Sequence, residues 1–341
     1  MIDKNTNRYI IIDILRVIGT MLVILAHVSL PRQISLIRSF DVCLLVLISG
    51  YVYEKSEKKE LYKEYVWKRI RRLCIPSYVT IMTIFLTCLI LCILVGREYP
   101  YSIKEIFETF LFIGGKTGGI GFFWIVRIYL IMALIAPFLK KINEKIFSDI
   151  FYFILILILL ILNNYIYFLT WNKYGIICNF FIENYIMSLL AYSCVYLVGI
   201  RIASNNKFKK MSYIIFSILV IPVIFKMTVD NNYSVSEYKY PPLIEYITYG
   251  VWGTLMLWLI VEKIFIKCKN FKIITWLSKE SFNIYLAHIF VLFLMSWGNK
   301  YLLKVNILNN WLIRYIIIII FSLITVSLKN KSLKIIINKK G

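Results

Sequence analysis

Long apolar runs separated by short polar clusters account for almost the whole chain. Most of these runs are long enough to cross the roughly 30 Å hydrocarbon core of a bilayer as a helix of about 20 residues. The pattern predicts about ten membrane-spanning helices, at residues 10–30, 39–53, 73–96, 121–139, 150–170, 185–202, 211–229, 244–266, 281–299 and 308–328. The second run is short for a full crossing, so we expect it to be tilted less, broken or partly re-entrant.

Composition and charge indicate the class of protein and its orientation in the membrane. The chain has 341 residues, 60% of them hydrophobic, which excludes an ordinary soluble domain. With the N-terminus inside, 27 of the 40 Lys and Arg residues fall on the inner side and 10 on the outer side. The positive-inside rule then predicts that both termini are cytoplasmic, and the positive charge needs no nucleic-acid partner.

The predicted fold class is therefore an all-α integral membrane protein, a bundle of about ten transmembrane helices. We expect one membrane domain over residues 1–341, with no fused extracytoplasmic domain. The seven cysteines show no CxxC pair and no metal-type spacing, so we expect them to be inert apolar residues and expect no metal site. The start of the chain lacks a small-residue cleavage site, which favours a retained first helix over a signal peptide.

The first apolar run carries ionisable residues where each of them costs free energy. Asp13, Arg16 and His27 lie within it, and Arg16 and His27 are eleven residues apart, or about three helical turns. These two side chains therefore share one helix face, and Thr20 lies on the same stripe. Such a stripe must face a bundle interior or a wet cavity, and by default it predicts a functional site.

His27 is the candidate general base of this stripe. An intramembrane histidine can simply bond across helices, but two costly groups on one face are hard to explain by packing alone. A neutral imidazole in an apolar cavity suits proton abstraction from a hydroxyl group. Arg16 lies about 16 Å nearer the cytoplasm, too far to touch the imidazole. We expect it to pair with Asp13 or to line a route toward His27.

His288 is the only other histidine, and its role stays open between a structural hydrogen bond and a site residue. If the ninth span begins near Ser281, His288 is only about 10 Å from the inner end of its helix, whereas His27 is about 25 Å from its own. The sequence therefore predicts that the two histidines do not form a dyad.

The longest basic stretch is the inner loop at residues 54–72. Its spacing predicts an amphipathic helix lying on the membrane surface, with Pro76 in the opening turn of the next span. Arg69 and Arg72 are three residues apart and so share a face, where two guanidinium groups can grip a phosphate. Inner loops attract Lys and Arg in general, but for this pair we favour phosphate binding.

Two residues at the outer ends of spans have alternative interpretations. Trp124 is either a residue of the interfacial aromatic belt, which is the safer interpretation, or a wall of an outer cavity. Asp41 either caps the second span or approaches the His27 end of the first. Ser49 and Gly50 predict close helix packing.

These residues together give a pattern that resembles membrane-bound acyltransferase family 3. The first-helix signature is an aspartate, a leucine-arginine pair and then a histidine after ten residues, as in Asp13-Ile14-Leu15-Arg16 and His27. The second helix resembles the family in running from Asp41 to Ser49-Gly50-Tyr51, although it lacks the double Phe that many relatives show. The resemblance continues through Arg69 and Arg72, the region from Trp124 to Pro137, and the stretch from Ser281 to His288.

The resemblance implies a ten-helix enzyme of a bacterial-type plasma membrane. Such an enzyme takes an acyl group, commonly acetyl, from cytoplasmic acyl-CoA and delivers it to a sugar hydroxyl near the outer face. By that analogy His27 is the catalytic base, Arg16 supports the pore, and Arg69 and Arg72 hold the CoA phosphates. The expected acceptor is a cell-surface polysaccharide or its lipid-linked precursor, with a separate glycan-biosynthesis protein as a further partner.

An exporter of exopolysaccharide is the alternative, because some members of the family carry that label. An exporter needs a wide polar path through the membrane, lined by many groups that bind sugar. Here the ionisable groups within spans are few and concentrate on the first run, which favours chemistry over transport.

Overall fold

The computed structural model describes residues 4–56, 60–113, 120–170, 176–265, 272–299 and 310–338. Within these ranges the chain is helical, and β structure is limited to one isolated bridge between Lys239 and Pro242. The α-helices are α1 (Lys4–Leu25), α2 (Arg32–Ile37), α3 (Asp41–Lys55), α4 (Tyr62–Val95), α5 (Ile103–Phe110), α6 (Trp124–Lys145), α7 (Asp149–Thr170), α8 (Ile176–Phe181), α9 (Met187–Ser204), α10 (Asn206–Leu219), α11 (Ile221–Val229), α12 (Ile244–Phe265), α13 (Lys272–Gly298) and α14 (Trp311–Asn338). Short 3-10 turns at Gly121–Phe123 and Val235–Tyr238 and a π turn at Ile182–Ile186 complete the elements.

The predicted spans correspond to these helices. In the described ranges nine helical segments are long and apolar enough to cross a membrane, and they match the second to tenth predicted spans. The first predicted span corresponds to α1. This helix is not among the nine, because its 22 residues include the charged side chains Arg8, Asp13 and Arg16. Helix α1 nevertheless packs inside the bundle against α3, α12 and α13. The predicted all-α integral membrane bundle is confirmed.

Helices α4 and α13 begin about ten residues earlier than predicted, and both differences affect the site. Helix α4 runs unbroken from Tyr62 through Pro76, so the separate surface helix expected in the basic loop is wrong. A proline inside a helix removes one backbone bond, here to the Arg72 carbonyl, without ending the helix. Helix α13 begins at Lys272 rather than near Ser281. Its first turns contain polar residues, so the apolar run that predicted the span does not include them.

The core forms where α3 and α9 cross. Both helices are almost wholly buried, which removes the need for the short α3 to match the bilayer thickness by itself. A Cβ atom on Gly199 would lie 2.1 Å from the Leu47 carbonyl oxygen, and one on Gly50 would lie 2.4 Å from the Tyr196 carbonyl oxygen. Only glycine allows the two backbones to approach so closely, which confirms the close packing predicted at Gly50.

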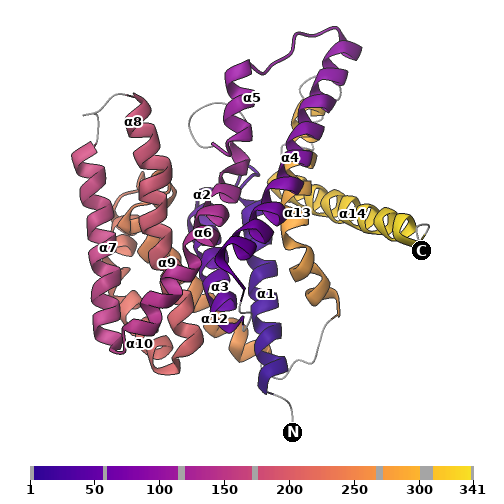
Figure 1. Ribbon diagram of the computed structural model, residues 1–341. Helices are drawn as coiled ribbons and strands as arrows, with labels where there is room; N and C mark the ends of the chain where they lie inside the picture. Colours follow the sequence, from indigo (N-terminus) through magenta and orange to yellow (C-terminus); the bar gives the residue numbers. More distant parts are fainter. Residues whose placement is uncertain are drawn as a thin grey trace.

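Burial decreases from this centre outward. In α9, 83% of the apolar segment is buried inside the protein, compared with 17% in α14. Figure 1 shows α1, α3 and α12 in the middle of the molecule, α7 and α10 on one side, and α14 extending away on the other. The poorly buried helices present apolar side chains outward, as expected for contact with lipid.

Candidate active site

The polar stripe of α1 is completed by a residue of α13. The Arg16 guanidinium donates to the Ser278 hydroxyl at 2.9 Å, and that hydroxyl donates to the Asp13 carboxylate at 2.5 Å. The expected pairing of Arg16 with Asp13 is present at 3.7 Å. Ser278 therefore fixes the direction of the Arg16 side chain.

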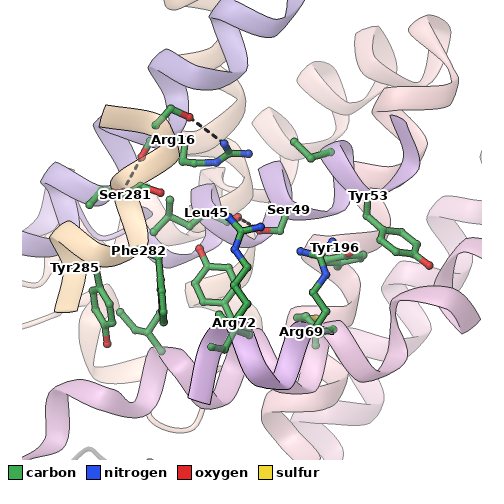
Figure 2. Close-up of a pocket in the computed structure, with 18 of the residues that line it drawn as sticks. Arg16, Leu45, Ser49, Tyr53, Arg69, Arg72, Tyr196, Ser281, Phe282 and Tyr285 are labelled. Atoms are coloured by element: carbon green, nitrogen blue, oxygen red, sulfur yellow. Dashed lines mark hydrogen bonds between the residues drawn. The ribbon is translucent and has the colours of Figure 1, made fainter. Parts of the chain in front are cut away.

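Arg16 opens into a cavity of about 410 Å³ that Arg69 and Arg72 also line. Figure 2 shows Arg69 and Arg72 side by side on α4, both pointing into this pocket. The predicted shared face of these two arginines is confirmed. The structure also brings Arg16, more than 50 residues away in sequence, to the same cavity, so three guanidinium groups face one space.

Aromatic side chains form the ends of the cavity. Tyr53, Tyr65 and Tyr196 lie at the end near Arg69, whose guanidinium sits over the Tyr65 ring at 5.2 Å from the centroid. Phe282 and Tyr285 of α13 lie at the other end (Figure 2). The cavity thus offers cations for phosphate groups and ring faces for flat or apolar groups.

The structure corrects the prediction that the two histidines lie apart. The rings of His27 and His288 stack at 5.4 Å between centroids with an angle of 21° between their planes. The prediction was wrong because α13 begins at Lys272. His288 is then 16 residues, or about 24 Å, from the start of its helix instead of the 10 Å expected, and it reaches the level of His27. The Phe122 ring packs edge-on against His27, with 4.5 Å between the ring centroids, and covers one side of the histidine pair.

A backbone contact sets the state of the His288 ring. Its Nδ1 atom contacts the Tyr285 carbonyl oxygen. A carbonyl can only accept, so in the neutral ring Nδ1 carries the proton and Nε2 keeps its lone pair. The Nε2 atoms of both histidines are buried and have no hydrogen-bond partner among the described residues.

Tyr285 joins the cavity to the histidine pair. Its side chain lines the cavity, its carbonyl contacts His288, and its hydroxyl donates to the Phe122 carbonyl at 2.5 Å. Thr20 also lines the cavity, on the α1 face that leads toward His27. The cavity therefore ends within one or two side chains of the imidazoles.

Asp41 binds two cations near the histidines and also bonds to the first turn of α3. Its carboxylate binds Arg38 at 2.8 Å and Lys239 at 3.1 Å, and its Oδ1 atom accepts the backbone N–H of Val42 at 2.8 Å. Arg38 and Lys239 are both within electrostatic range of His27.

Trp124 is 4% exposed and packs edge-on against Tyr240 at 4.9 Å. Its predicted place in the interfacial belt is wrong, because the 3-10 turn at Gly121–Phe123 directs the first turn of α6 into the bundle. Trp124 instead packs against Lys239, whose Nζ lies 5.2 Å from the ring centroid.

Comparison with protein families decides the identity of the chain. The model of an acyltransferase domain, that of acyltransferase family 3, matches residues 9–329. The chain belongs to this family. It is a membrane acyltransferase. Searches of curated proteins and of solved structures found no match.

In this acyltransferase, several residues at the site were not predicted from the sequence. Ser278, Phe282 and Tyr285 follow each other at helical spacing on one face of α13, so their pattern was present but lay partly outside the apolar run. Lys239 lies in a loop and pairs with Asp41 across 198 residues, for which the sequence holds no signal. In the described ranges, no three His, Cys, Asp or Glu side chains come together as metal ligands.

Proposed function

We propose that this protein is an O-acyltransferase that moves an acyl group, acetyl in the simplest case, from cytoplasmic acyl-CoA to a sugar hydroxyl. The acceptor is a cell-surface polysaccharide or its lipid-linked precursor, reached from the outer face of a bacterial-type plasma membrane. The observation that carries this proposal is a cavity lined by three arginines and by Tyr285, whose backbone carbonyl contacts one of two stacked histidines.

The arginine end of the cavity suits the phosphate groups of CoA. Arg69 and Arg72 lie at the end of the predicted cytoplasmic segment, residues 54–72. Arg16 adds a third guanidinium group, whose direction is fixed by its hydrogen bond to Ser278. Guanidinium groups bind phosphate through paired, charge-assisted hydrogen bonds. The tyrosines at this end provide ring faces for the adenine base.

The middle of the cavity suits the thin arm of the donor. Thr20 and Tyr129 line it between the arginines and Tyr285. The separation of Arg16 and His27 along α1, about 16 Å, is a distance that an extended pantetheine arm can cover. The thioester would then lie beside the histidine pair while the nucleotide stays at the inner end.

At the histidines the reaction needs one base and no metal. The acceptor hydroxyl oxygen attacks the thioester carbonyl carbon while its proton passes to His27 Nε2. Collapse of the tetrahedral intermediate breaks the carbon–sulfur bond, the ester remains on the sugar, and the imidazolium proton goes to the departing CoA thiolate. Stacking against His288 and edge-on packing against Phe122 hold the His27 ring in place.

A sided vesicle experiment tests this proposal against the exporter alternative. Purified protein is reconstituted in lipid vesicles with acetyl-CoA only at the face that carries Arg69 and Arg72, and a sugar acceptor only at the other face. We expect acetylated sugar to appear on the acceptor side, without movement of sugar across the membrane. Sugar movement that is independent of acetyl-CoA and survives His27→Ala would favour the exporter.

A further inference from the structure

Three buried side chains form an ionic cluster at the His27 end of the bundle. Arg38, Asp41 and Lys239 are 9%, 1% and 8% exposed. Both cations bind the one carboxylate, at 2.8 Å and 3.1 Å. The cluster therefore carries a surplus positive charge inside the protein.

A further buried cation increases this surplus. Arg127 is 5% exposed, and its hydrogen bonds go to neutral acceptors, the Phe112 carbonyl at 3.3 Å and the Asn184 amide oxygen at 2.9 Å. Tyr240 lies within electrostatic range of both Arg38 and Arg127. The predicted outer segments outside the described residues, 114–119, 171–175 and 300–309, contain lysine but neither Asp nor Glu. They hold no carboxylate that could balance the charge.

The cluster and Arg127 also have buried donors without a partner among the described residues. The Nε atoms of Arg38 and Arg127 are buried, and neither has a partner among the described residues. Aromatic rings flank the Lys239 ammonium, with centroids at 5.2 Å for Trp124 and 5.7 Å for Tyr246. These rings stabilise a cation but do not neutralise it. Buried cations without full compensation are costly unless an anion completes them.

The position of the cluster indicates which substrate would bring that anion. Arg38 and Lys239 act electrostatically on His27, yet neither lines the cavity that Arg16, Arg69 and Arg72 share. The anionic part of the donor thus has its own cations at the opposite end. Beside the cluster, the partly exposed Tyr240 has its ring centroid 5.9 Å from the Lys239 ammonium.

We propose that Arg38 and Lys239, held by Asp41, bind a negatively charged group of the acceptor, a carboxylate or a phosphate, close to the hydroxyl that is acylated. This inference rests on the proposed acyl transfer and names its acceptor class, an acidic or phosphate-bearing glycan. Arg127 adds to the field at this position. The acidic group is held while the neighbouring hydroxyl faces His27.

Matched acceptors test the inference on the wild-type protein in vesicles with acetyl-CoA. The pairs are methyl glucoside with methyl glucuronoside, methyl galactoside with methyl galacturonoside, and methyl glucoside with its 6-phosphate. We expect kcat/KM to be about tenfold or more higher for the charged member of at least one pair, as for one charge-assisted contact. A carboxylate preference and a phosphate preference distinguish the two sources of the anion.

Variants assign the preference to the cluster. Lys239→Met should bring the ratio of charged to neutral acceptor close to one, and Lys239→Arg should retain most of it. Lys104→Met is the matched control, because Lys104 is an exposed lysine of α5 in a predicted outer loop, and its ratio should not change. If Lys239→Met does not fold, the wild-type ratio and its decrease with added salt still decide the question.

Equal rates for charged and neutral acceptors, with ester formation still lost in His27→Ala, would overturn the acceptor class and leave the proposed function standing. A preference that follows the donor, with succinyl-CoA favoured over acetyl-CoA and the acceptor charge without effect, would also overturn it. Failure of the wild type to acylate any of these sugars would count against both proposals.

Discussion

Replacing Arg69 and Arg72 together by Gln should weaken acyl-CoA binding without disturbing the fold. Both side chains point into the cavity, and Arg72 is exposed, so neither supports the core (Figure 2). A charge-assisted hydrogen bond to phosphate contributes about 1.5 to 3 kcal/mol, and the solvent in the cavity favours the lower end. About 1.4 kcal/mol corresponds to a factor of ten in Kd. The two changes act on neighbouring phosphate contacts and need not add fully, so we expect a loss of about tenfold to a hundredfold.

Binding of radiolabelled acetyl-CoA to purified protein in nanodiscs measures this loss directly. Arg71→Gln is the matched control, because Arg71 lies between the two on the same helix, is exposed and is outside the set of residues that line the cavity. It removes one positive charge from the same segment where the double variant removes two, so a general effect of positive potential would appear in it at about half the size. An unchanged Kd in the double variant, or an equal loss in the control, would refute phosphate binding by this pair.

Three further predictions follow from the same geometry. His27→Ala should lower ester formation by about two to four orders of magnitude while acetyl-CoA still binds, because a base is lost; undiminished glycan acylation at equal protein level, measured by mass spectrometry, would show that His27 is not the base. Ser278→Ala should raise KM for acetyl-CoA several-fold with little change in kcat, since Arg16 loses the bond that directs it; Ser278→Thr should restore the value, and an unchanged KM would exclude this positioning role. Gly199→Ala should lower the melting temperature or the yield of folded protein, because its Cβ would lie 2.1 Å from the Leu47 carbonyl oxygen, whereas Gly298→Ala, with no atom within 4 Å of its Cβ, should not; equal stability of the two variants would contradict the close packing of α3 and α9.

The sequence by itself determined the features that depend on local spacing. Helix periodicity fixes which residues of one helix share a face, so the stripe of α1 and the pair Arg69 and Arg72 could be predicted from residue numbers alone. Apolar runs of bilayer length gave the spans for the same reason. The motif around Asp13, Arg16 and His27 also gave the family.

Only the tertiary structure decided which of these faces meet. Hydropathy registers the apolar part of a helix, so it missed the polar first turns of α13 and misplaced His288 by about nine residues. Packing of α13 against α1 then brings Ser278 to Arg16 and His288 to His27. Lys239 reaches Asp41 from a loop 198 residues away, and no periodicity within one segment can encode such a contact. Contacts between helices depend on shape and on close approach at glycines such as Gly199, which exist only in the folded bundle.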